Sequence, residues 1–124
     1  MSPVIGVGID AVDIERFRLV LHRRPQMADR LFSGDERAVL DGRGDPVPSL
    51  AARFAAKEAA MKALQTGLGG VDFTDIEVLC EPGGAPRLSV SGRASERAGR
   101  LGVTRWHVSL SHTATLATAV VVAD

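Results

Sequence analysis

The sequence predicts an α+β fold: a single compact domain in which one long central helix packs on an antiparallel sheet. Two observations carry this prediction. The first is an alanine-rich run at residues 49–66, bounded by Pro48 and Gly67, which indicates a helix with both ends marked. The second is that the later strand-like segments come in pairs joined by turns, which is typical of antiparallel hairpins. The length of 124 residues fits one domain, residues 1–124.

The first strand and the first helix are predicted from the spacing of apolar residues. Residues 4–9 are apolar apart from two glycines, which predicts a strand that is buried on both faces and ends at Asp10. Residues 13–24 are expected to form an amphipathic helix that Pro25 terminates. Its apolar residues recur at spacings of three and four: Ile14, Phe17 and Leu21.

Shorter elements are expected between this helix and the central one. One or two helical turns are predicted at residues 27–32. The run Ser33-Gly34-Asp35-Glu36 has the form of a capping box, which would open a short helix extending to Leu40. Residues 41–48 contain two glycines and two prolines, so we expect a loop there.

The second half of the chain is predicted to hold two hairpins and one helix. Residues 75–80 and 87–91 alternate apolar and polar side chains on either side of a turn, which indicates a hairpin with a long loop. Residues 92–101 indicate a polar helix. Residues 106–110 and 116–123 are the predicted strands of the second hairpin.

Charge and composition exclude several classes of protein. Fifteen basic and fifteen acidic residues cancel, and the chain has no tyrosine and one tryptophan, so neither charge nor stacking favours a nucleic-acid binder. No apolar run is long enough to span a membrane, and no signal peptide is expected. The single cysteine, Cys80, excludes an internal disulfide and predicts a reducing, cytoplasmic location.

Two charged residues enter the apolar face of the central helix. Lys57 occupies the missing position in the apolar stripe, and Glu58 lies at its edge. Both need partners, since an unpaired buried charge is costly. The alternatives are an internal salt bridge, side chains that reach outward to solvent, or a functional site. The apolar members of the stripe are Leu50, Phe54, Met61 and Leu64.

Asp10 and Glu58 are candidate metal ligands. Two carboxylates from separate elements, together with nearby bases, are the residue types that Mg²⁺ and a phosphate require. The bases are Arg53, Lys57 and Lys62. Asp10 could instead simply cap the next helix, because aspartate is a favoured N-cap residue.

Two further groups of residues could bind anions. His112 follows a predicted strand, between Ser111 and Thr113, in a setting that suits either a phosphate or a simple turn. The helix predicted at residues 13–24 has a basic end, which would suit an acidic partner but is also usual for a solvated helix face. Its basic residues are Arg16, Arg18, His22, Arg23 and Arg24.

Three motifs, in this order, make the sequence resemble the holo-acyl-carrier-protein synthase type of 4'-phosphopantetheinyl transferase. They are Gly6-Val7-Gly8-Ile9-Asp10 with Arg16 behind it, Arg53-Phe54-Ala55-Ala56-Lys57-Glu58-Ala59 with Lys62, and His107-Val108-Ser109-Leu110-Ser111-His112. The resemblance covers essentially the whole chain. It implies that the 4'-phosphopantetheine arm of coenzyme A is transferred to a serine hydroxyl of an acyl carrier protein, with release of adenosine 3',5'-bisphosphate.

The resemblance implies catalytic roles for three residues. Asp10 and Glu58 would hold Mg²⁺, with Mn²⁺ as the alternative metal, on the pyrophosphate of coenzyme A, and Lys62 would contact the phosphates. Glu58 is also the candidate base for the proton of the serine hydroxyl, directly or through a metal-bound water.

The resemblance also implies residues that bind the nucleotide end of coenzyme A. Arg53, His112 and Thr113 match positions expected near its 3'-phosphate. A basic loop grips coenzyme A elsewhere in the family, and here Arg43 is the only base of that loop.

Assembly and partner are implied in the same way. The family forms homotrimers with sites between subunits, so Asp10 and Glu58 need not share a site with His112 of the same chain. The acidic carrier protein, from fatty-acid, polyketide or peptide synthesis, would dock on the first helix. The docking residues would be Arg16, Arg18, Arg23 and Arg24. The alternatives are a non-catalytic module that binds coenzyme A or a nucleotide, and a purely structural trimer.

Overall fold

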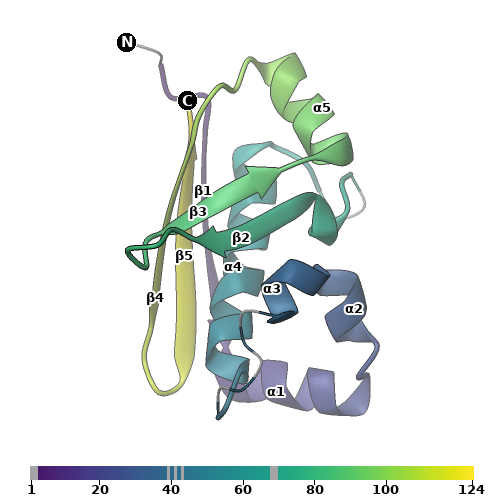
Figure 1. Ribbon diagram of the computed structural model, residues 1–124. Coiled ribbons are helices and arrows are strands. Elements are labelled where there is room, and N and C mark those ends of the chain that lie inside the picture. The colour runs from purple at the N-terminus through teal and green to yellow at the C-terminus, as the bar shows by residue number, and fades with distance from the viewer. Residues whose placement is uncertain (1–2, 39, 41, 43, 68–69) are drawn as a thin grey trace.

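The computed structural model describes residues 3–38, 40, 42, 44–67 and 70–124. The described residues form the helices and strands that Figure 1 labels, and a 3₁₀ turn, η1, follows α4. In chain order the elements are β1 (Gly6–Asp13), α1 (Ile14–Arg23), α2 (Met27–Leu31), α3 (Gly34–Ala38), α4 (Val47–Ala63), η1 (Phe73–Asp75), β2 (Ile76–Cys80), β3 (Pro86–Val90), α5 (Gly92–Leu101), β4 (Trp106–His112) and β5 (Leu116–Ala123).

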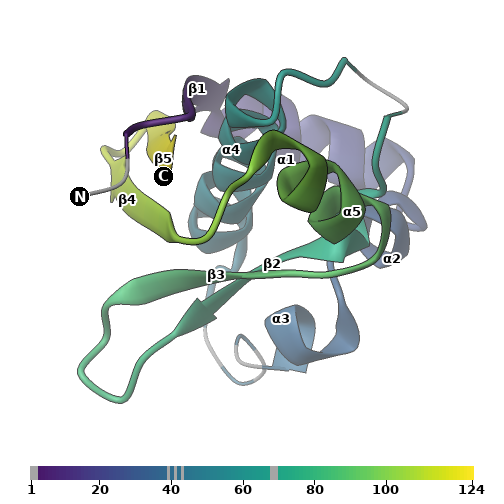
Figure 2. The ribbon, with the colours of Figure 1, turned by 90° about the horizontal axis from the view of Figure 1, so that it is seen from above.

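The strands form two antiparallel sheets around α4. The larger sheet has the order β1-β5-β4, and the smaller sheet is the β2-β3 hairpin. Figure 2 shows α4 standing between the larger sheet on one side and α1, α2 and α5 on the other. The predicted α+β fold, with a long central helix on an antiparallel sheet, is therefore confirmed.

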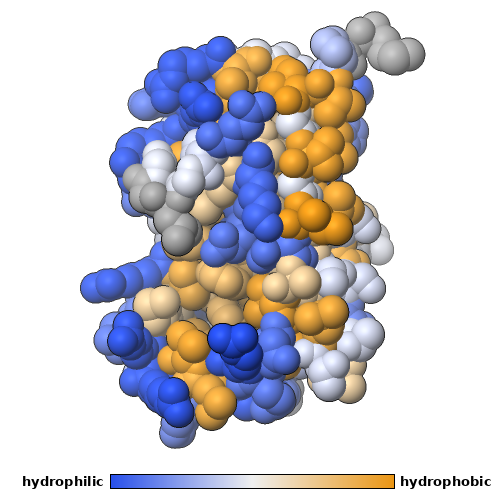
Figure 3. Space-filling view, turned by 180° about the vertical axis from the view of Figure 1, so that it is seen from behind, coloured by the Kyte–Doolittle hydropathy of each residue, from blue (hydrophilic) through white to orange (hydrophobic). Residues whose placement is uncertain are grey.

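The prediction that the first strand is buried on both faces is wrong for the single chain. One face of β1 covers α4, whereas Val7 and Ile9, on the other face, are 58% and 66% exposed. The continuous apolar run therefore reflects an outward apolar face rather than a second covered face. Figure 3 shows apolar surface along the side of the molecule that carries the strands.

Gly6 and Gly8 bring the backbone of β1 directly onto α4. A Cβ atom at Gly8 would lie 1.7 Å from the carbonyl oxygen of Ala59, and one at Gly6 would lie 1.9 Å from that of Ala63. Real side chains never approach a backbone oxygen so closely, so only glycine permits this contact.

The helix ends differ slightly from the predicted ones, and one capping assignment changes. α4 begins at Val47 and ends at Ala63, rather than spanning residues 49–66, because Pro48 is tolerated inside the first turn and Gln65 adopts a positive φ of 58°. The cap of α1 is Asp13, whose Oδ1 accepts a hydrogen bond from the Arg16 backbone N–H at 2.9 Å. Asp10 does not serve as this cap.

Lys57 forms a fully buried ion pair, so the internal salt bridge is the correct alternative for this residue. Its Nζ donates to Glu36 Oε1 at 2.7 Å and also to the carbonyl oxygens of Phe73 and Ile76. Burial lowers the pKa of the Lys57 ammonium, and the charge of Glu36 opposes this change. Lys57 is therefore not available to a phosphate, which corrects its place among the candidate anion-binding bases.

Glu36 is oriented by the predicted capping box, which is confirmed. Ser33 Oγ accepts from the Glu36 N–H, and Glu36 Oε1 accepts from the Ser33 N–H. The second carboxylate oxygen of Glu36 accepts from the Val78 N–H at 3.0 Å. The buried pair thus ties α3, α4 and β2 together.

Candidate functional site

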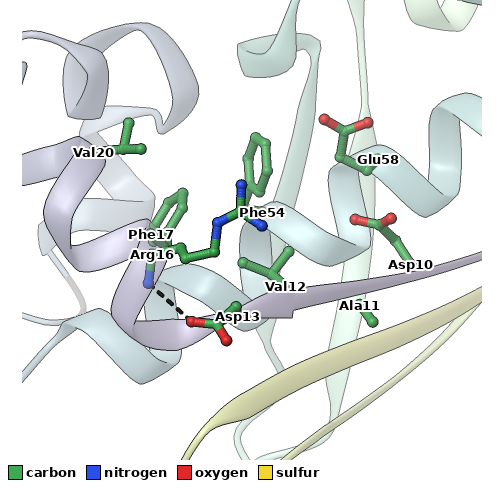
Figure 4. Close-up of a pocket in the computed structure, with 9 residues that line it drawn as sticks. All are labelled: Asp10, Ala11, Val12, Asp13, Arg16, Phe17, Val20, Phe54 and Glu58. Carbon is green, nitrogen blue, oxygen red and sulfur yellow. Dashed lines mark hydrogen bonds between the residues drawn. The ribbon is translucent and has the colours of Figure 1, made fainter.

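A pocket of about 370 Å³ lies between β1, α1 and α4. Asp10 enters it from β1 and Glu58 enters it from α4, and Figure 4 shows the two carboxylates beside each other on one side of the pocket. Phe17 and Phe54 line the pocket as well, and their rings stack with centroids 5.2 Å apart. The two residues that the sequence suggests as metal ligands are thus brought together.

The two carboxylates influence each other electrostatically. Burial, followed by the negative charge of Asp10, raises the pKa of Glu58 above its usual 4.5, and the positive charge of Lys62 opposes this rise. Lys62 Nζ lies 3.3 Å from Asp10 Oδ1 and donates to the Ile9 carbonyl oxygen at 2.8 Å. Within the described part of the chain, the Glu58 carboxylate has neither a hydrogen bond nor an ion pair.

This donor set fits Mg²⁺. Magnesium is commonly held by one or two carboxylates, with substrate phosphates and water as its remaining ligands. Among the described residues, no group of three or more His, Cys, Asp or Glu side chains could hold a metal ion. Asp10 and Glu58 could supply two hard oxygen ligands, with the remaining positions left to a substrate and water.

On the assignment of Asp10 and Glu58 as Mg²⁺ ligands, the affinity for Mg²⁺ is expected to fall at a higher pH during acidification than it would with an ordinary glutamate. Only ionised Glu58 can bind the cation, so affinity is full above its raised pKa and is lost as the pH drops through that value. Isothermal titration with MgCl₂ between pH 8 and pH 5 measures this loss. Asp13→Asn, which alters another acid of the same pocket, is the control and should show the same pH dependence as the unmodified protein. A pH-independent affinity would contradict the metal assignment.

A second pocket, of about 260 Å³, contains the residues suggested for the nucleotide end of coenzyme A. Arg53 and His112 both line it, and Arg53 is only 5% exposed. Arg53 Nη1 donates to Ser49 Oγ at 2.6 Å, while its buried Nε has no partner in the described part of the chain. A buried guanidinium with an unused N–H is well suited to an anionic ligand.

At the tip of the second hairpin, Thr113 and His112 differ in how much of their hydrogen-bonding capacity is already used within the chain. Thr113 Oγ1 accepts hydrogen bonds from the N–H groups of Thr115 and Leu116, so the hydroxyl closes the turn and only its own proton remains to be donated. His112 Nδ1 lies 3.2 Å from the Thr113 carbonyl oxygen. Arg43 lies outside the described residues.

The two pockets are separate in one chain because of helical geometry. Arg53 and Glu58 are five positions apart on α4, which corresponds to about 140° around a helix with 3.6 residues per turn. Glu58 therefore faces the pocket that contains Asp10, and Arg53 faces the pocket that contains His112.

Sequence reasoning missed several residues of the second pocket. Ser49 was seen only as a helix start, although its spacing of four from Arg53 is the separation at which helical side chains meet. Cys80, Gly84 and Pro86 come from the β2-β3 hairpin. No sequence signal links that hairpin to Arg53, since the contact is tertiary.

The basic residues of α1 fall into two groups. Arg18 forms a two-armed ion pair with Asp45, at 2.9 and 2.7 Å, so its charge is already engaged. Arg16 lines the pocket of Asp10 and Glu58. Arg23 and Arg24 line a separate apolar pocket of about 260 Å³ with Val20 and Met27. They are exposed cations beside exposed apolar surface.

No helix among the described residues is both long enough and apolar enough to cross a membrane.

Comparison with known proteins gives consistent matches along nearly the whole chain. The profile of a family described as the 4'-phosphopantetheinyl transferase superfamily matches residues 6–121. The holo-[acyl-carrier-protein] synthase of Streptomyces griseus subsp. griseus is 55% identical over 121 residues, which cover 98% of each chain.

Solved structures match in fold as well as in sequence. The crystal structure of the holo-[acyl-carrier-protein] synthase from Neisseria meningitidis has a TM-score of 0.89 and 32% identity, and the match covers 98% of this chain and 99% of that one. The Helicobacter pylori holo-[acyl-carrier-protein] synthase in complex with coenzyme A has a TM-score of 0.83 and 33% identity, covering 95% of this chain and 99% of that one.

Proposed function

Because this chain belongs to the 4'-phosphopantetheinyl transferase superfamily, as an enzyme of the holo-[acyl-carrier-protein] synthase type, we propose that it uses Mg²⁺ to transfer 4'-phosphopantetheine from coenzyme A. The acceptor is a serine hydroxyl of an apo acyl carrier protein, and adenosine 3',5'-bisphosphate is the second product. The single observation that carries the metal-dependent proposal is that Asp10 and Glu58, from β1 and α4, meet in one pocket.

The residues of this pocket have complementary roles in the reaction. Phosphoryl transfer depends on positioning and charge neutralisation more than on covalent help from the protein. When bound, Mg²⁺ would supply a Lewis acid that neutralises the pyrophosphate. Lys62, which now contacts Asp10, adds a second positive charge for the phosphate oxygens. Glu58, whose pKa is raised, is the candidate acceptor of the serine proton.

The second pocket is proposed to hold the nucleotide end of coenzyme A. Arg53 would pair with the 3'-phosphate, because its buried guanidinium has an N–H without a partner. His112 lines the same pocket, and Thr113 retains one hydroxyl proton to donate. The Helicobacter pylori relative in complex with coenzyme A supports this use of the fold. Arg43 is a further proposed contact.

We further propose a homotrimer with active sites between subunits. Asp10 and Glu58 occupy one pocket and Arg53 and His112 another, so one chain alone does not assemble the whole set. The outward apolar face of β1 is a surface that association would cover.

Ile9→Lys is expected to dissociate the trimer, because it places an ammonium in the middle of that apolar face. Light scattering coupled to size-exclusion chromatography would then give the mass of one chain instead of three. Glu96→Lys, on the exposed side of α5, is the control and should remain trimeric. A trimer that persists in Ile9→Lys would place the subunit contact elsewhere.

The basic end of α1 is the proposed docking surface for the acidic carrier protein. Arg23 and Arg24 are its main contributors and Arg16 lies at the pocket edge, while Arg18 is largely neutralised by Asp45. Charge complementarity of this kind mostly accelerates encounter and is screened by salt.

Replacing both Arg23 and Arg24 by alanine should raise the KM for the carrier about tenfold at low salt, with little change in kcat. The difference from the unmodified protein should shrink as NaCl is added. Steady-state assays at several salt concentrations check this, with Arg100→Ala on α5 as the control. An unchanged KM at low salt would move the docking surface elsewhere.

The deciding experiment for the proposed function is mass spectrometry of an apo carrier protein incubated with the enzyme, coenzyme A and Mg²⁺. The proposal expects a mass increase of one phosphopantetheine on the carrier, which chelation of the metal abolishes. Calorimetric binding of coenzyme A without any mass increase would instead identify a non-catalytic coenzyme A-binding module. The single cysteine is in keeping with a cytoplasmic location.

A further inference from the structure

Cys80 is the one cysteine of the chain, and it is exposed at the rim of the second pocket. It is the last residue of β2 and pairs with Pro86 across the β2-β3 hairpin. Gly84, at the tip of the same hairpin, lines the pocket as well. The thiol thus belongs to the wall of a cavity that already contains a buried cation.

The guanidinium of Arg53 lies beside the sulfur of Cys80. Arg53 is 95% buried, since its exposed fraction is 5%, and its Nη2 lies 3.7 Å from Cys80 Sγ. Its Nη1 is held by Ser49, and its buried Nε has no partner in the described ranges. The guanidinium therefore contacts the sulfur, and it places a buried positive charge in the wall of the cavity.

The sulfur has the two features that distinguish reactive cysteines from inert ones. Reactive cysteines lie in electropositive and partly exposed surroundings, whereas structural cysteines are buried among apolar groups. Cys80 is exposed, and Arg53 Nη2 donates toward its sulfur. A small disulfide that carries a carboxylate and enters the cavity would meet the guanidinium of Arg53, which could bind the carboxylate, and the sulfur of Cys80, which could act as a nucleophile.

We propose that Cys80 is a redox-sensitive gate on coenzyme A binding, closed by formation of a mixed disulfide with a low-molecular-weight disulfide. The proposal builds on the proposed function, in which this cavity takes the nucleotide end of coenzyme A. The Cys80 sulfur attacks one sulfur of the small disulfide, whose S–S bond breaks as the new S–S bond forms. The other half leaves as a thiol and takes the proton from Cys80, so no further oxidant is needed. A reducing thiol reverses the step.

The adduct would block coenzyme A by volume and by charge. The cavity measures about 260 Å³, and a peptide-sized thiol attached to its rim would fill much of that space. A carboxylate of the adduct would also occupy the donors of Arg53 that the phosphate needs. The gate therefore predicts that large anionic adducts inhibit more strongly than a small neutral one.

The test uses the whole protein and glutathione disulfide as the probe. Intact-mass spectrometry is expected to show one adduct, which must lie on Cys80 because the chain has no other cysteine. The Kd for desulfo-coenzyme A, which has no thiol that could reduce the adduct, should rise at least tenfold in the adduct when measured by calorimetry, and it should return to its starting value after the adduct is removed with dithiothreitol. Adenosine 3',5'-bisphosphate should slow adduct formation, because it would occupy the same cavity.

Two comparisons separate a gate from unspecific damage. Cys80→Ser should show the same coenzyme A affinity before and after treatment with the disulfide. A methylthio adduct on Cys80, made with methyl methanethiosulfonate, should raise the Kd less than the glutathione adduct does.

Three results would overturn the gate. These are an adduct that leaves the Kd unchanged, an adduct that forms only after unfolding in urea, and equal inhibition of Cys80→Ser. Failure of the proposed function is distinguishable, because it shows as absent carrier modification by the fully reduced protein before any disulfide is added.

Discussion

Glu58→Gln and Asp10→Asn are each expected to lower kcat for carrier modification by about 10²–10³-fold while leaving the protein folded. Each change removes one negative oxygen from the pair that faces the pocket, without altering side-chain size. Neither carboxylate is a helix cap, and neither is fully buried, so the fold does not depend on its charge. The loss should therefore appear in the activity rather than in the melting temperature.

The measurement is mass spectrometric rate determination at saturating coenzyme A, with a parallel titration of Mg²⁺. Asp13→Asn is the matched control, because Asp13 lines the same pocket and asparagine caps α1 about as well as aspartate. It should retain most of the activity. A kcat equal to that of the unmodified protein in either Glu58→Gln or Asp10→Asn would contradict the assignment of that residue as a metal ligand.

Lys57→Met is expected to lower the free energy of unfolding by about 3–5 kcal/mol, because it leaves the carboxylate of Glu36 buried without its cation. Glu36 and Lys57 both have side chains with no exposed surface, so solvent cannot compensate for the loss. Against a total stability of about 5–15 kcal/mol for a domain, one such change brings the protein close to unfolding.

Urea denaturation measures this effect, and Glu36→Leu alone together with the double variant Lys57→Met/Glu36→Leu completes a double-mutant cycle. We expect the double variant to be more stable than Lys57→Met alone, since no unpaired charge remains. Arg93→Ala, which breaks the exposed pair with Asp72, is the control and should cost no more than about 1 kcal/mol. A loss below 1 kcal/mol in Lys57→Met would mean that water reaches Glu36.

Local patterns were sufficient to predict most elements of the fold. The polar helix predicted at residues 92–101 matches α5, and the capping box at residues 33–36 opens α3 as expected. These features depend on neighbouring residues only, so their signal is contained in short stretches of sequence. The observed ends of α4 differ from the predicted ones. A proline inside the first turn and a residue with positive φ, Gln65, near the last turn do not by themselves fix where the helix begins and ends.

Contacts between distant residues could not be predicted in this way. The Lys57–Glu36 pair joins two helices and the Arg18–Asp45 pair joins a helix to a loop, and no sequence period relates the partners of either pair. The residue types alone only suggested that Asp10 and Glu58 meet, and the resemblance to a known family turned this suggestion into a firm expectation. The outward exposure of Ile9 could not be inferred either, because an apolar strand has the same sequence whether its second face is covered by a helix or by another subunit.

The touching main chains of Gly8 and Ala59 have a further consequence for the carboxylate pair. Asp10 follows Gly8 by two positions on the same side of its strand, and Glu58 directly precedes Ala59. The backbone positions from which the two carboxylates extend are thus set by the close packing of strand on helix. A single methyl group at position 8 would push the strand away from the helix and so change the spacing of the two proposed metal ligands without touching either of them.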